Sequence, residues 1–256
     1  METLKTFLIF CALAASPGIA SAVDFSTVEV TGKRVTVCRV DVRKEHLQVF
    51  HRDEEGQPFR RFDRLISWLE SRDQRLLFAM NAGMYHRDFS AVGLFVSEGK
   101  QGAPLNTARG RGNFFLKPNG VFAITKKGAC VVESSAYPKL KNVLLATQSG
   151  PLLVLNGKIH RAFEVDSESR LIRNGVGVPS PGIALFAISE EPVNFYEFAV
   201  LFRDVLRCPN ALFLDGNVSS LYSVKLKRNT LRSELGPMIG VTESMAKTVR
   251  APQAKK

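Results

Sequence analysis

Four short apolar runs in this sequence each lead into a hydrogen-bonding side chain that is followed by glycine. Glycine lets a ligand approach the backbone closely, and loops that follow the strands of a rigid sheet often carry functional groups. We therefore expect the four segments to contribute to one site, although each alone is also typical of an ordinary turn. The segments are Asn81-Ala82-Gly83, Gln148-Ser149-Gly150, Arg173-Asn174-Gly175-Val176-Gly177 and Asp215-Gly216.

The side chains of these segments suit a ligand that carries both a sugar and a phosphate. Arg173 can hold a phosphate through the two-pronged fork of its guanidinium group. Asn81 and Ser149 can form hydrogen bonds with hydroxyl groups or phosphate oxygens. Asp215 can act as a base, a nucleophile or a stabiliser of positive charge. Together they predict a site for an anionic sugar.

The order of these segments resembles that of the signature segments of the phosphodiester glycosidase family. The family includes a lysosomal enzyme that removes N-acetylglucosamine from phosphodiester-linked mannose, and exported bacterial proteins, some of them related to exopolysaccharide. The similarity covers roughly residues 75 to 241. It rests on NAGMY from residue 81, QSGPLLVLNG from residue 148, RNGVGV from residue 173 and LFLDGNVSSLY from residue 212.

The resemblance implies an exported hydrolase that cleaves the glycosidic bond of a sugar phosphodiester, releasing a free sugar and a phosphomonoester. Envelope or exopolysaccharide metabolism is the expected context. The expected catalytic residues are Asp215, Arg173 and Asn81. The positions expected to bind substrate are Gly83, Ser149, Gly150, Asn174, Gly216, Ser219 and Ser220. For Ser219 and Ser220 the alternative is that they hold the Asp215 loop.

Two signature segments depart from the family pattern. Asn217 and Val218 stand where the family has two glycines in Asp-Gly-Gly-Gly-Ser-Ser, and Ala82 stands where it has the first glycine of Asn-Gly-Gly. Larger side chains are expected to narrow these loops. Either a changed substrate or weakened catalysis would follow.

A single motif carboxylate is compatible with the implied reaction. An ordinary glycosidase needs two carboxyl groups because a sugar alkoxide must be protonated as it leaves. A phosphate monoester leaves without a proton if a cation stabilises its charge. We therefore expect Arg173 to hold the departing phosphate, Asp215 to stabilise the sugar cation, and Asn81 and Ser149 to position the diester.

Composition and the N-terminal sequence predict an exported protein. Residues 1–22 combine Lys5, an apolar run and a final Ala-Ser-Ala, the pattern of a cleaved secretory signal. No later apolar run is long enough to cross a bilayer, so we expect a periplasmic or secreted protein with no transmembrane segment in its mature chain.

The net charge of +11 is compatible with nucleic acid, an anionic surface or an anionic substrate. Export argues against nucleic acid and favours a sugar phosphodiester or anionic glycan as partner.

Three cysteines follow the predicted signal, so at most one intramolecular disulfide can form, and the sequence does not indicate which pair. They are Cys38, Cys130 and Cys208. Zinc-ligand spacing is absent from the sequence. We expect no cofactor, while a divalent ion near Asp215 remains an open alternative.

Alternating apolar and polar residues separated by turn residues predict an α+β fold: a mixed, largely antiparallel sheet with few helices, in a single domain over residues 23–242. Asn156-Gly157 predicts a tight hairpin. One helix is expected to have Pro58 in its first turn. A second is expected to be capped by Asn194, with Val205 on its buried face. Residues 243–256 are predicted to form a basic, disordered tail.

Other interpretations of the candidate site and of the whole chain remain open. His86 could reach the site, and Arg109 and Arg111 lie in either a ligand-binding loop or a solvated turn. The chain could also be a non-catalytic carbohydrate-binding or polysaccharide-assembly protein. A third hypothesis is an envelope protein that its positive charge holds to an anionic polymer.

Overall fold

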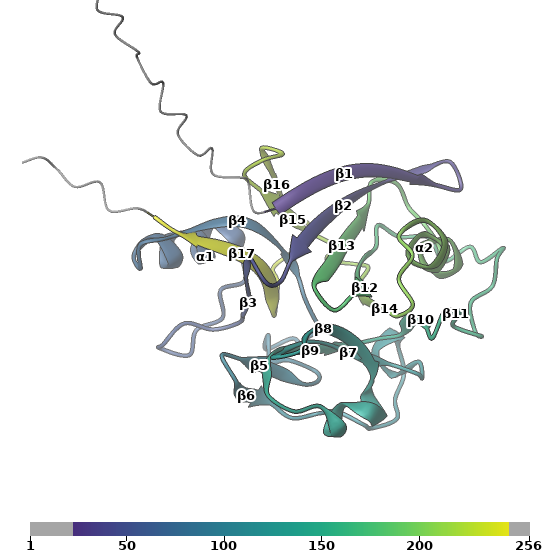
Figure 1. Ribbon diagram of the computed structural model, residues 1–256, viewed down its shortest axis with the longest axis horizontal. Helices are drawn as coiled ribbons and strands as arrows, with labels where there is room; N and C mark the ends of the chain where they lie inside the picture. The colour runs from purple at the N-terminus through teal and green to yellow at the C-terminus, as the bar shows by residue number, and fades with distance from the viewer. Residues whose placement is uncertain (1–22, 246–256) are drawn as a thin grey trace, which may run out of the picture.

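Short β-forming segments, separated by turn residues, build three antiparallel sheets and two helices in the computed structural model, which describes residues 23–245 (Figure 1). The α+β class and the largely antiparallel sheet arrangement are confirmed. Every pairing between the described strands is antiparallel. The predicted signal, residues 1–22, and residues 246–256 of the predicted tail lie outside the described residues.

The first sheet has seven strands in the order β1-β2-β13-β12-β14-β10-β11. A two-residue turn at Thr31 and Gly32, both with positive φ, joins β1 to β2 as a hairpin of this type requires. The predicted Asn156-Gly157 hairpin has the same form and joins β10 to β11. The strand bounds are β1 Val23–Val30, β2 Lys33–Asp41, β10 Leu152–Leu155, β11 Lys158–Ile159, β12 Asn174–Ser180, β13 Ile183–Ser189 and β14 Ala211–Asp215.

The second and third sheets have five strands each, in the orders β16-β15-β4-β17-β3 and β6-β5-β9-β7-β8. The late strand β17 pairs with both β4 and β3, so it lies inside the second sheet. The second sheet contains β3 His46–Phe50, β4 Gln74–Asn81, β15 Leu221–Ser223, β16 Arg228–Thr230 and β17 Met238–Ser244. The third contains β5 Phe95–Ser97, β6 Lys100–Ala103, β7 Gly120–Thr125, β8 Gly128–Glu133 and β9 Val143–Ser149.

The three sheets share one apolar core. Phe78 of β4, Phe122 of β7 and Phe186 of β13 are fully buried and come from three different sheets. Their ring centroids lie 5.5 Å apart for Phe78 and Phe186 and 5.7 Å apart for Phe122 and Phe186. Aromatic rings bury large apolar areas and gain further from tilted contacts at this separation. This cluster therefore fixes the sheets relative to one another.

The two predicted helices form, with different ends. Helix α1 spans Phe62–Glu70, and Pro58 lies before it, in a bridge with Arg52, so the prediction of Pro58 in the first turn is wrong. Helix α2 spans Phe195–Val200 and begins with the predicted Asn194 cap: the Asn194 side chain accepts from the Glu197 backbone N–H, and the Glu197 carboxylate accepts from that of Asn194.

Helix α2 continues as one π-helical segment, η3, from Leu201 to Val205. The wider π turn changes the direction of the side chains that follow it. Val205, predicted to be buried, is therefore 42% exposed.

Shorter elements connect these strands and helices. They include the 3-10 helices η1 Asn113–Phe115 and η2 Ser134–Lys139, and isolated bridges such as the one between Leu171 and Val193. The predicted tail also needs a correction at its start, because β17 continues to Ser244 and pairs there with Gln74.

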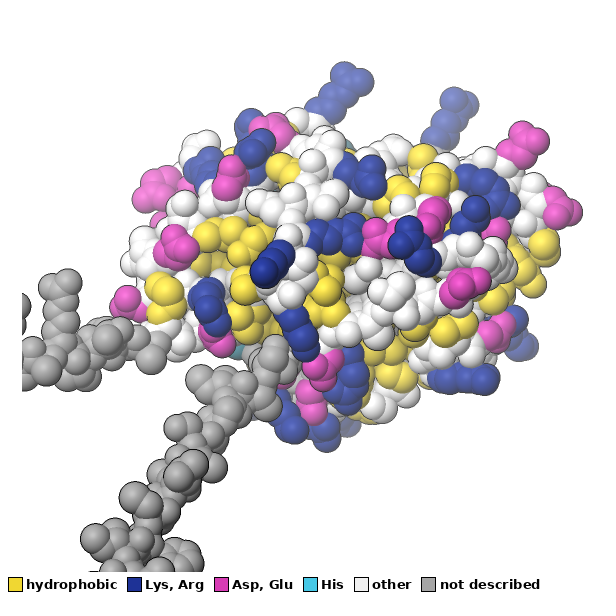
Figure 2. All heavy atoms as spheres, turned by 90° about the horizontal axis from the view of Figure 1, so that it is seen from above, with side chains coloured by type: hydrophobic (Ala, Val, Ile, Leu, Met, Phe, Trp, Pro, Cys, Tyr) yellow, Lys and Arg dark blue, Asp and Glu magenta, His cyan; other side chains and the backbone are white. Residues whose placement is uncertain are grey.

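Two surface properties bear on function. Among residues 23–245 the structure has no helix with the length and apolar character needed to cross a bilayer. On the face drawn in Figure 2, Lys and Arg side chains are spread among Asp and Glu side chains, with apolar surface between them.

Candidate active site

The three sheets each supply one interior strand that ends at the candidate site. Strand β4 ends at Asn81, β9 at Ser149 and β14 at Asp215, as the sequence predicts. The fourth segment differs, because Asn174 to Gly177 lie inside β12 rather than in a loop. The prediction of a break there is wrong, yet Arg173 still lies directly before the strand.

Asp215 presents a carboxylate that its own loop holds in place. Its Oδ1 accepts hydrogen bonds from the backbone N–H groups of Gly216, at 2.6 Å, and Asn217, at 3.0 Å. Burial raises the pKa of the Asp215 carboxyl group, while the N–H groups of Gly216, Asn217 and Val218 and the charge of Arg173 lower it. The Asp215 side chain is half-buried, whereas Asn81, Ser149 and Asn174 are fully buried, so Asp215 is the acid of the site that a ligand can reach.

Arg173 is fully buried, which is rare for an arginine. Its Nε donates to the Val193 carbonyl at 2.9 Å, and its Nη2 donates to the Ser169 carbonyl at 2.8 Å. The guanidinium carbon lies 3.8 Å from the centroid of the Phe195 ring, close enough for a cation–π contact. Burial lowers the Arg173 pKa to about 10, and the negative charge of Asp215 opposes that effect. The group therefore remains a cation at neutral pH.

One nitrogen of Arg173 is left without a partner. Nη1 is buried and makes no hydrogen bond with any described residue. A buried, unpaired guanidinium N–H is costly unless an anion can reach it. A β-carbon built on Gly216 would lie 3.5 Å from Nη1 and 3.1 Å from Cδ1 of Leu171. The glycine after Asp215 thus keeps open the space beside the free nitrogen.

Asn81 and Asn174 join the second sheet to the first. Asn81 Nδ2 donates to Asn174 Oδ1 at 3.0 Å, and Asn174 Nδ2 donates back to the Asn81 carbonyl at 3.0 Å. Asn174 Oδ1 also accepts from the Asp215 backbone N–H at 3.0 Å, and Asn81 Oδ1 accepts from the Ser220 N–H at 2.9 Å. Both amides are buried and their hydrogen bonds stay within the protein. Their geometry fixes where Asp215 lies.

Ser149, Ser219 and Ser220 are also buried and also bond to backbone. The Ser149 hydroxyl donates to the Leu214 carbonyl at 2.8 Å, which ties β9 to β14 directly before Asp215. Ser219 Oγ lies 3.0 Å from both the Ile172 and the Asp215 carbonyls. The Ser220 hydroxyl donates to the Val218 carbonyl at 2.7 Å. These contacts hold the loop that carries Asp215.

Gly83 and Gly150 permit close packing at the same junction. A β-carbon on Gly83 would lie 2.4 Å from the Gln148 carbonyl oxygen, and one on Gly150 would lie 2.8 Å from that of Phe114. Real side chains do not approach backbone atoms so closely, so these positions require glycine. The structure thus brings all ten predicted site residues together around β4, β9, β12 and β14. Asp215 is half-buried, and the Nη1 of Arg173 is buried without a hydrogen-bond partner among residues 23–245.

Tyr85, the last residue of the NAGMY segment, is a further residue near the site that was not predicted. The charges of Asp215 and Glu234 act on Tyr85, and together with burial, the largest cause, they raise its pKa to about 12. Its hydroxyl group therefore stays protonated and donates to the Glu234 carbonyl at 2.5 Å. Nothing in the sequence around Tyr85 indicates a functional role. Only the fold brings it close enough for the charge of Asp215 to affect its pKa.

Several other candidates gain no support from the structure. His86, Arg109 and Arg111 are exposed. Cys38, Cys130 and Cys208 are free thiols. Within residues 23–245, the structure has no cluster of three or more His, Cys, Asp or Glu side chains that could ligate a metal. The prediction of no cofactor stays a prediction.

Residues 74–242 match the phosphodiester glycosidase family. The chain belongs to this family. Its sequence is 33% identical over 222 residues to the uncharacterized protein YigE of Escherichia coli (strain K12), which covers 87% of each chain. The family predicted from the signature segments is thereby confirmed, and the chain is a member of a glycosidase family.

Two solved structures share the fold at 15% sequence identity. One is the zebrafish N-acetylglucosamine-1-phosphodiester alpha-N-acetylglucosaminidase catalytic domain, auto-inhibited by its pro-peptide, with a TM-score of 0.58 over 89% of this chain and 84% of that one. The other is a hypothetical protein from Synechocystis, with a TM-score of 0.56 over 85% of this chain and 61% of that one. At this identity the likeness concerns the fold.

Proposed function

We propose that this phosphodiester glycosidase family member hydrolyses the glycosidic bond of a sugar phosphodiester and releases a free sugar and a phosphomonoester. The observation that carries the proposal is the buried Arg173 guanidinium, whose Nη1 has no partner among the described residues and lies beside the Asp215 loop. An unpaired guanidinium nitrogen favours an anionic partner, and a phosphate offers the oxygen acceptors that a guanidinium binds best. The zebrafish enzyme of the same fold is named for a related reaction.

The charges of the site match the needs of this reaction. As the bond between the anomeric carbon and the phosphate oxygen breaks, the phosphate gains negative charge and the sugar ring gains positive charge. Arg173 stabilises the first, and its two backbone hydrogen bonds hold it in position before the reaction starts. Asp215 stabilises the second as an ionised carboxylate.

Water completes the reaction. Its oxygen bonds to the anomeric carbon, and a proton from that water is transferred through Asp215 or solvent, so that the products are a neutral sugar and a phosphomonoester. We assign positioning roles to Asn81, Asn174 and Ser149, because their polar atoms already bond to the strands that carry Asp215.

Hydrolysis in water enriched in oxygen-18 tests the bond that breaks. With a sugar 1-(4-nitrophenyl phosphate) diester as substrate, we expect the label in the released sugar and 4-nitrophenyl phosphate as the second product, detected by phosphorus NMR. Asp215→Asn should reduce the rate by at least about a hundredfold, the scale of losing one charge-stabilising group. Release of 4-nitrophenol with label in the phosphate, or a wild-type rate in Asp215→Asn, would overturn the proposal.

A second candidate is a protein that binds the glycan without cleaving it. It is favoured by Val218, which replaces a family glycine and packs against the apolar cluster around α1, so the Asp215 loop is anchored more firmly than glycine would allow. Saturable binding of the diester with no product after prolonged incubation would favour this candidate. Arg173→Lys should then weaken binding.

The location and cofactor requirements are further parts of the proposal. We propose a periplasmic or secreted protein, because residues 1–22 have the pattern of a cleaved signal. N-terminal sequencing of the protein purified from its host should begin at Val23. We propose a reaction without a cofactor, so activity should survive treatment with EDTA; loss that added divalent metal restores would contradict this.

A further inference from the structure

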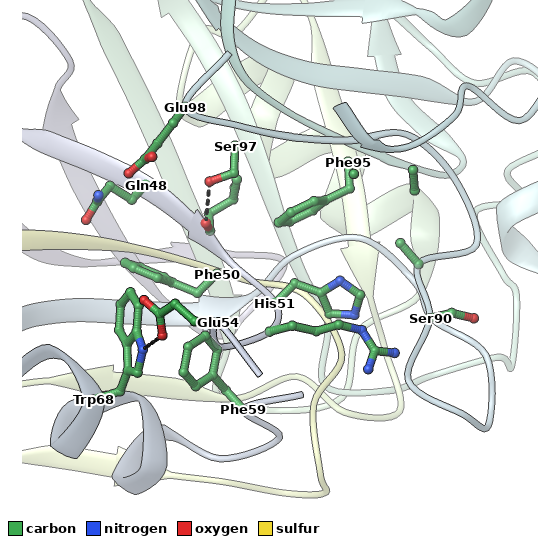
Figure 3. Close-up of a pocket in the computed structure, with 15 residues that line it drawn as sticks. Gln48, Phe50, His51, Glu54, Phe59, Trp68, Ser90, Phe95, Ser97 and Glu98 are labelled. Carbon is green, nitrogen blue, oxygen red and sulfur yellow. Dashed lines mark hydrogen bonds between the residues drawn. The ribbon is translucent and has the colours of Figure 1, made fainter. Parts of the chain in front are cut away.

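A pocket lies between β3, helix α1 and the hairpin of β5 and β6 (Figure 3). Its volume is about 500 Å³, within the range of about 300 to 1,000 Å³ that is usual for small-molecule sites. None of the ten candidate site residues, nor Tyr85, lines it. The pocket is therefore separate from the site around Asp215.

Aromatic side chains form much of the wall. The ring centroids of Phe50 and Phe59 lie 6.4 Å and 5.1 Å from that of Trp68, and the His51 ring lies 5.3 Å from that of Phe95. All three contacts are edge-to-face, so the rings support one another in fixed orientations. Apolar walls of this kind can pack against the C–H faces of a sugar ring.

Two of the three charged groups that line the pocket, Arg52 and Glu54, are already engaged. The Arg52 guanidinium donates to the carbonyls of Gly56, at 2.8 Å, and Asp88, at 3.4 Å. The Glu54 carboxylate accepts from the Trp68 indole at 2.9 Å and pairs with Arg72 at 2.6 Å. Neither group is left to bind an ionic ligand.

The polar atoms that remain open are suited to hydroxyl groups. His51 Nε2 lies 2.6 Å from the Phe89 carbonyl, which only accepts, so Nε2 carries the proton and Nδ1 is a free acceptor. Gln48 accepts from Thr242 through Oε1 at 3.0 Å, which leaves its amide N–H₂ group free to donate. Glu98 makes no ion pair with any described residue and offers two acceptor oxygens. In Figure 3, Gln48 and Glu98 lie at one end of the opening and His51 at the other.

We propose that this pocket binds one uncharged pyranose unit of a glycan, as a second carbohydrate site. A pyranose offers apolar ring faces for the aromatic walls and hydroxyl groups that both donate and accept, as the open atoms of Gln48, His51 and Glu98 require. The two sites are connected by the turn at residues 86–90. The Phe89 carbonyl accepts from His51, and the Phe89 ring stacks on Tyr85 with centroids 5.6 Å apart. The turn at residues 86–90 thus lies between a glycan bound in the pocket and the Asp215 site.

The single tryptophan of the chain makes the proposal testable, because Trp68 lines this pocket and is the only tryptophan present. We expect methyl glycosides of glucose, galactose or N-acetylglucosamine to change the fluorescence of the full-length protein saturably, with a Kd of roughly 0.1 to 10 mM. Sorbitol, an open-chain polyol without a ring, is the control and should give no saturable change. Absence of saturable binding with all three glycosides would overturn the proposal.

Three variants locate the binding. Ala103→Phe, at the pocket wall, should abolish it by filling the space, while Ala108→Phe, an exposed position outside the pocket, should leave it unchanged. Asp215→Asn should also leave it unchanged, because the pocket does not include Asp215. Binding that survives Ala103→Phe or disappears in Asp215→Asn would show that the sugar occupies another site. Because this assay measures binding, its result is independent of whether the protein hydrolyses a diester.

Removal of one hydrogen-bonding group gives a graded test. Gln48→Ala should raise the Kd about fivefold to tenfold, the effect of losing one hydrogen bond. Gln101→Ala, an exposed glutamine that does not line the pocket, should have no effect. Equal Kd values for the two variants would contradict the assignment of Gln48.

Discussion

At the scale of single residues, the candidate site consists of two ionisable groups and a set of polar side chains that hold them. Burial opposes ionisation of both Asp215 and Arg173, and each charge partly offsets the effect on the other. The amides of Asn81 and Asn174 use their hydrogen bonds within the protein. The chemistry therefore depends on a few atoms, and most of the signature residues serve to place them.

Replacement of Arg173 by lysine tests the need for a guanidinium group. Lysine keeps the charge but cannot donate at once to Val193, to Ser169 and to a phosphate as the guanidinium fork does. We expect kcat/KM for a sugar phosphodiester to fall at least about a hundredfold.

Arg170→Lys is the matched control, since Arg170 is exposed and pairs with Glu197 at the surface. It should retain nearly full activity. Thermal unfolding of both variants separates a loss of activity from a loss of fold, and equal activities would contradict the role of Arg173.

The pH dependence follows from the raised pKa of Asp215. If the ionised carboxylate is required, kcat/KM should fall as the pH drops through a value above the ordinary aspartate pKa of about 4. A pH–rate profile with its acid limb at or below the ordinary value would contradict this assignment.

The same shift has a consequence for stability. Because the folded-state pKa of Asp215 lies above the unfolded-state value, ionisation favours the unfolded state, and stability from this group is lost as the pH rises through the interval between the two values. Asp215→Asn removes the effect. The Tm of the variant relative to wild type should therefore increase with pH across that interval, which calorimetry at several pH values can measure.

At the scale of secondary-structure elements, strand ends were easier to predict than the interior of β12. Asn81, Ser149 and Asp215 end buried strands, and an apolar run followed by a polar residue and glycine indicated each of them correctly. By the same rule, Gly175 and Gly177 predicted the end of a strand, but both residues lie within β12. A β-carbon on Gly177 would lie 2.6 Å from atoms of Phe202 and Cys208. These glycines make room for α2 and η3, which no local pattern reveals.

Asn174 at the start of β12 is expected to be important for stability. Its side chain bonds to both Asn81 and the Asp215 backbone. Asn174→Ala leaves the partner groups buried and unsatisfied, so we expect the free energy of unfolding to fall by roughly 2 to 4 kcal/mol. Asn229→Ala, in the exposed middle of β16, is the control and should change it by less than about 0.5 kcal/mol. Urea unfolding of both variants provides the measurement, and similar values would show that the network is dispensable.

At the scale of the whole molecule, the family and the fold class could be predicted from the sequence, while the way the site is shared between sheets could not. The signature segments lie far apart in the chain, and local patterns do not specify which strands become neighbours. Only the structure shows that β4, β9 and β14 belong to three different sheets. The mutual packing of Phe78, Phe122 and Phe186 is what brings their ends together.

The net charge of +11 predicts a salt dependence that distinguishes substrate attraction from general adhesion. A cationic protein attracts an anionic diester, so kcat/KM should fall as sodium chloride rises, with kcat nearly constant. The spread of basic and acidic groups in Figure 2 predicts a moderate effect. If the protein were instead an envelope component held by charge alone, its binding to an anionic polymer would disappear with salt and would be indifferent to Arg173→Lys and Asp215→Asn.

The position of β17 has a consequence for the order in which the molecule assembles. Residues 238–244 lie between β3 and β4, yet β17 begins 157 positions after the end of β4 and 188 positions after the end of β3. Until they emerge, β3 and β4 have no common neighbour and the strand that carries Asn81 has an open side. A nascent chain that stops at residue 237 should therefore stay sensitive to protease, and resistance should appear in one step once the final strand is free to insert.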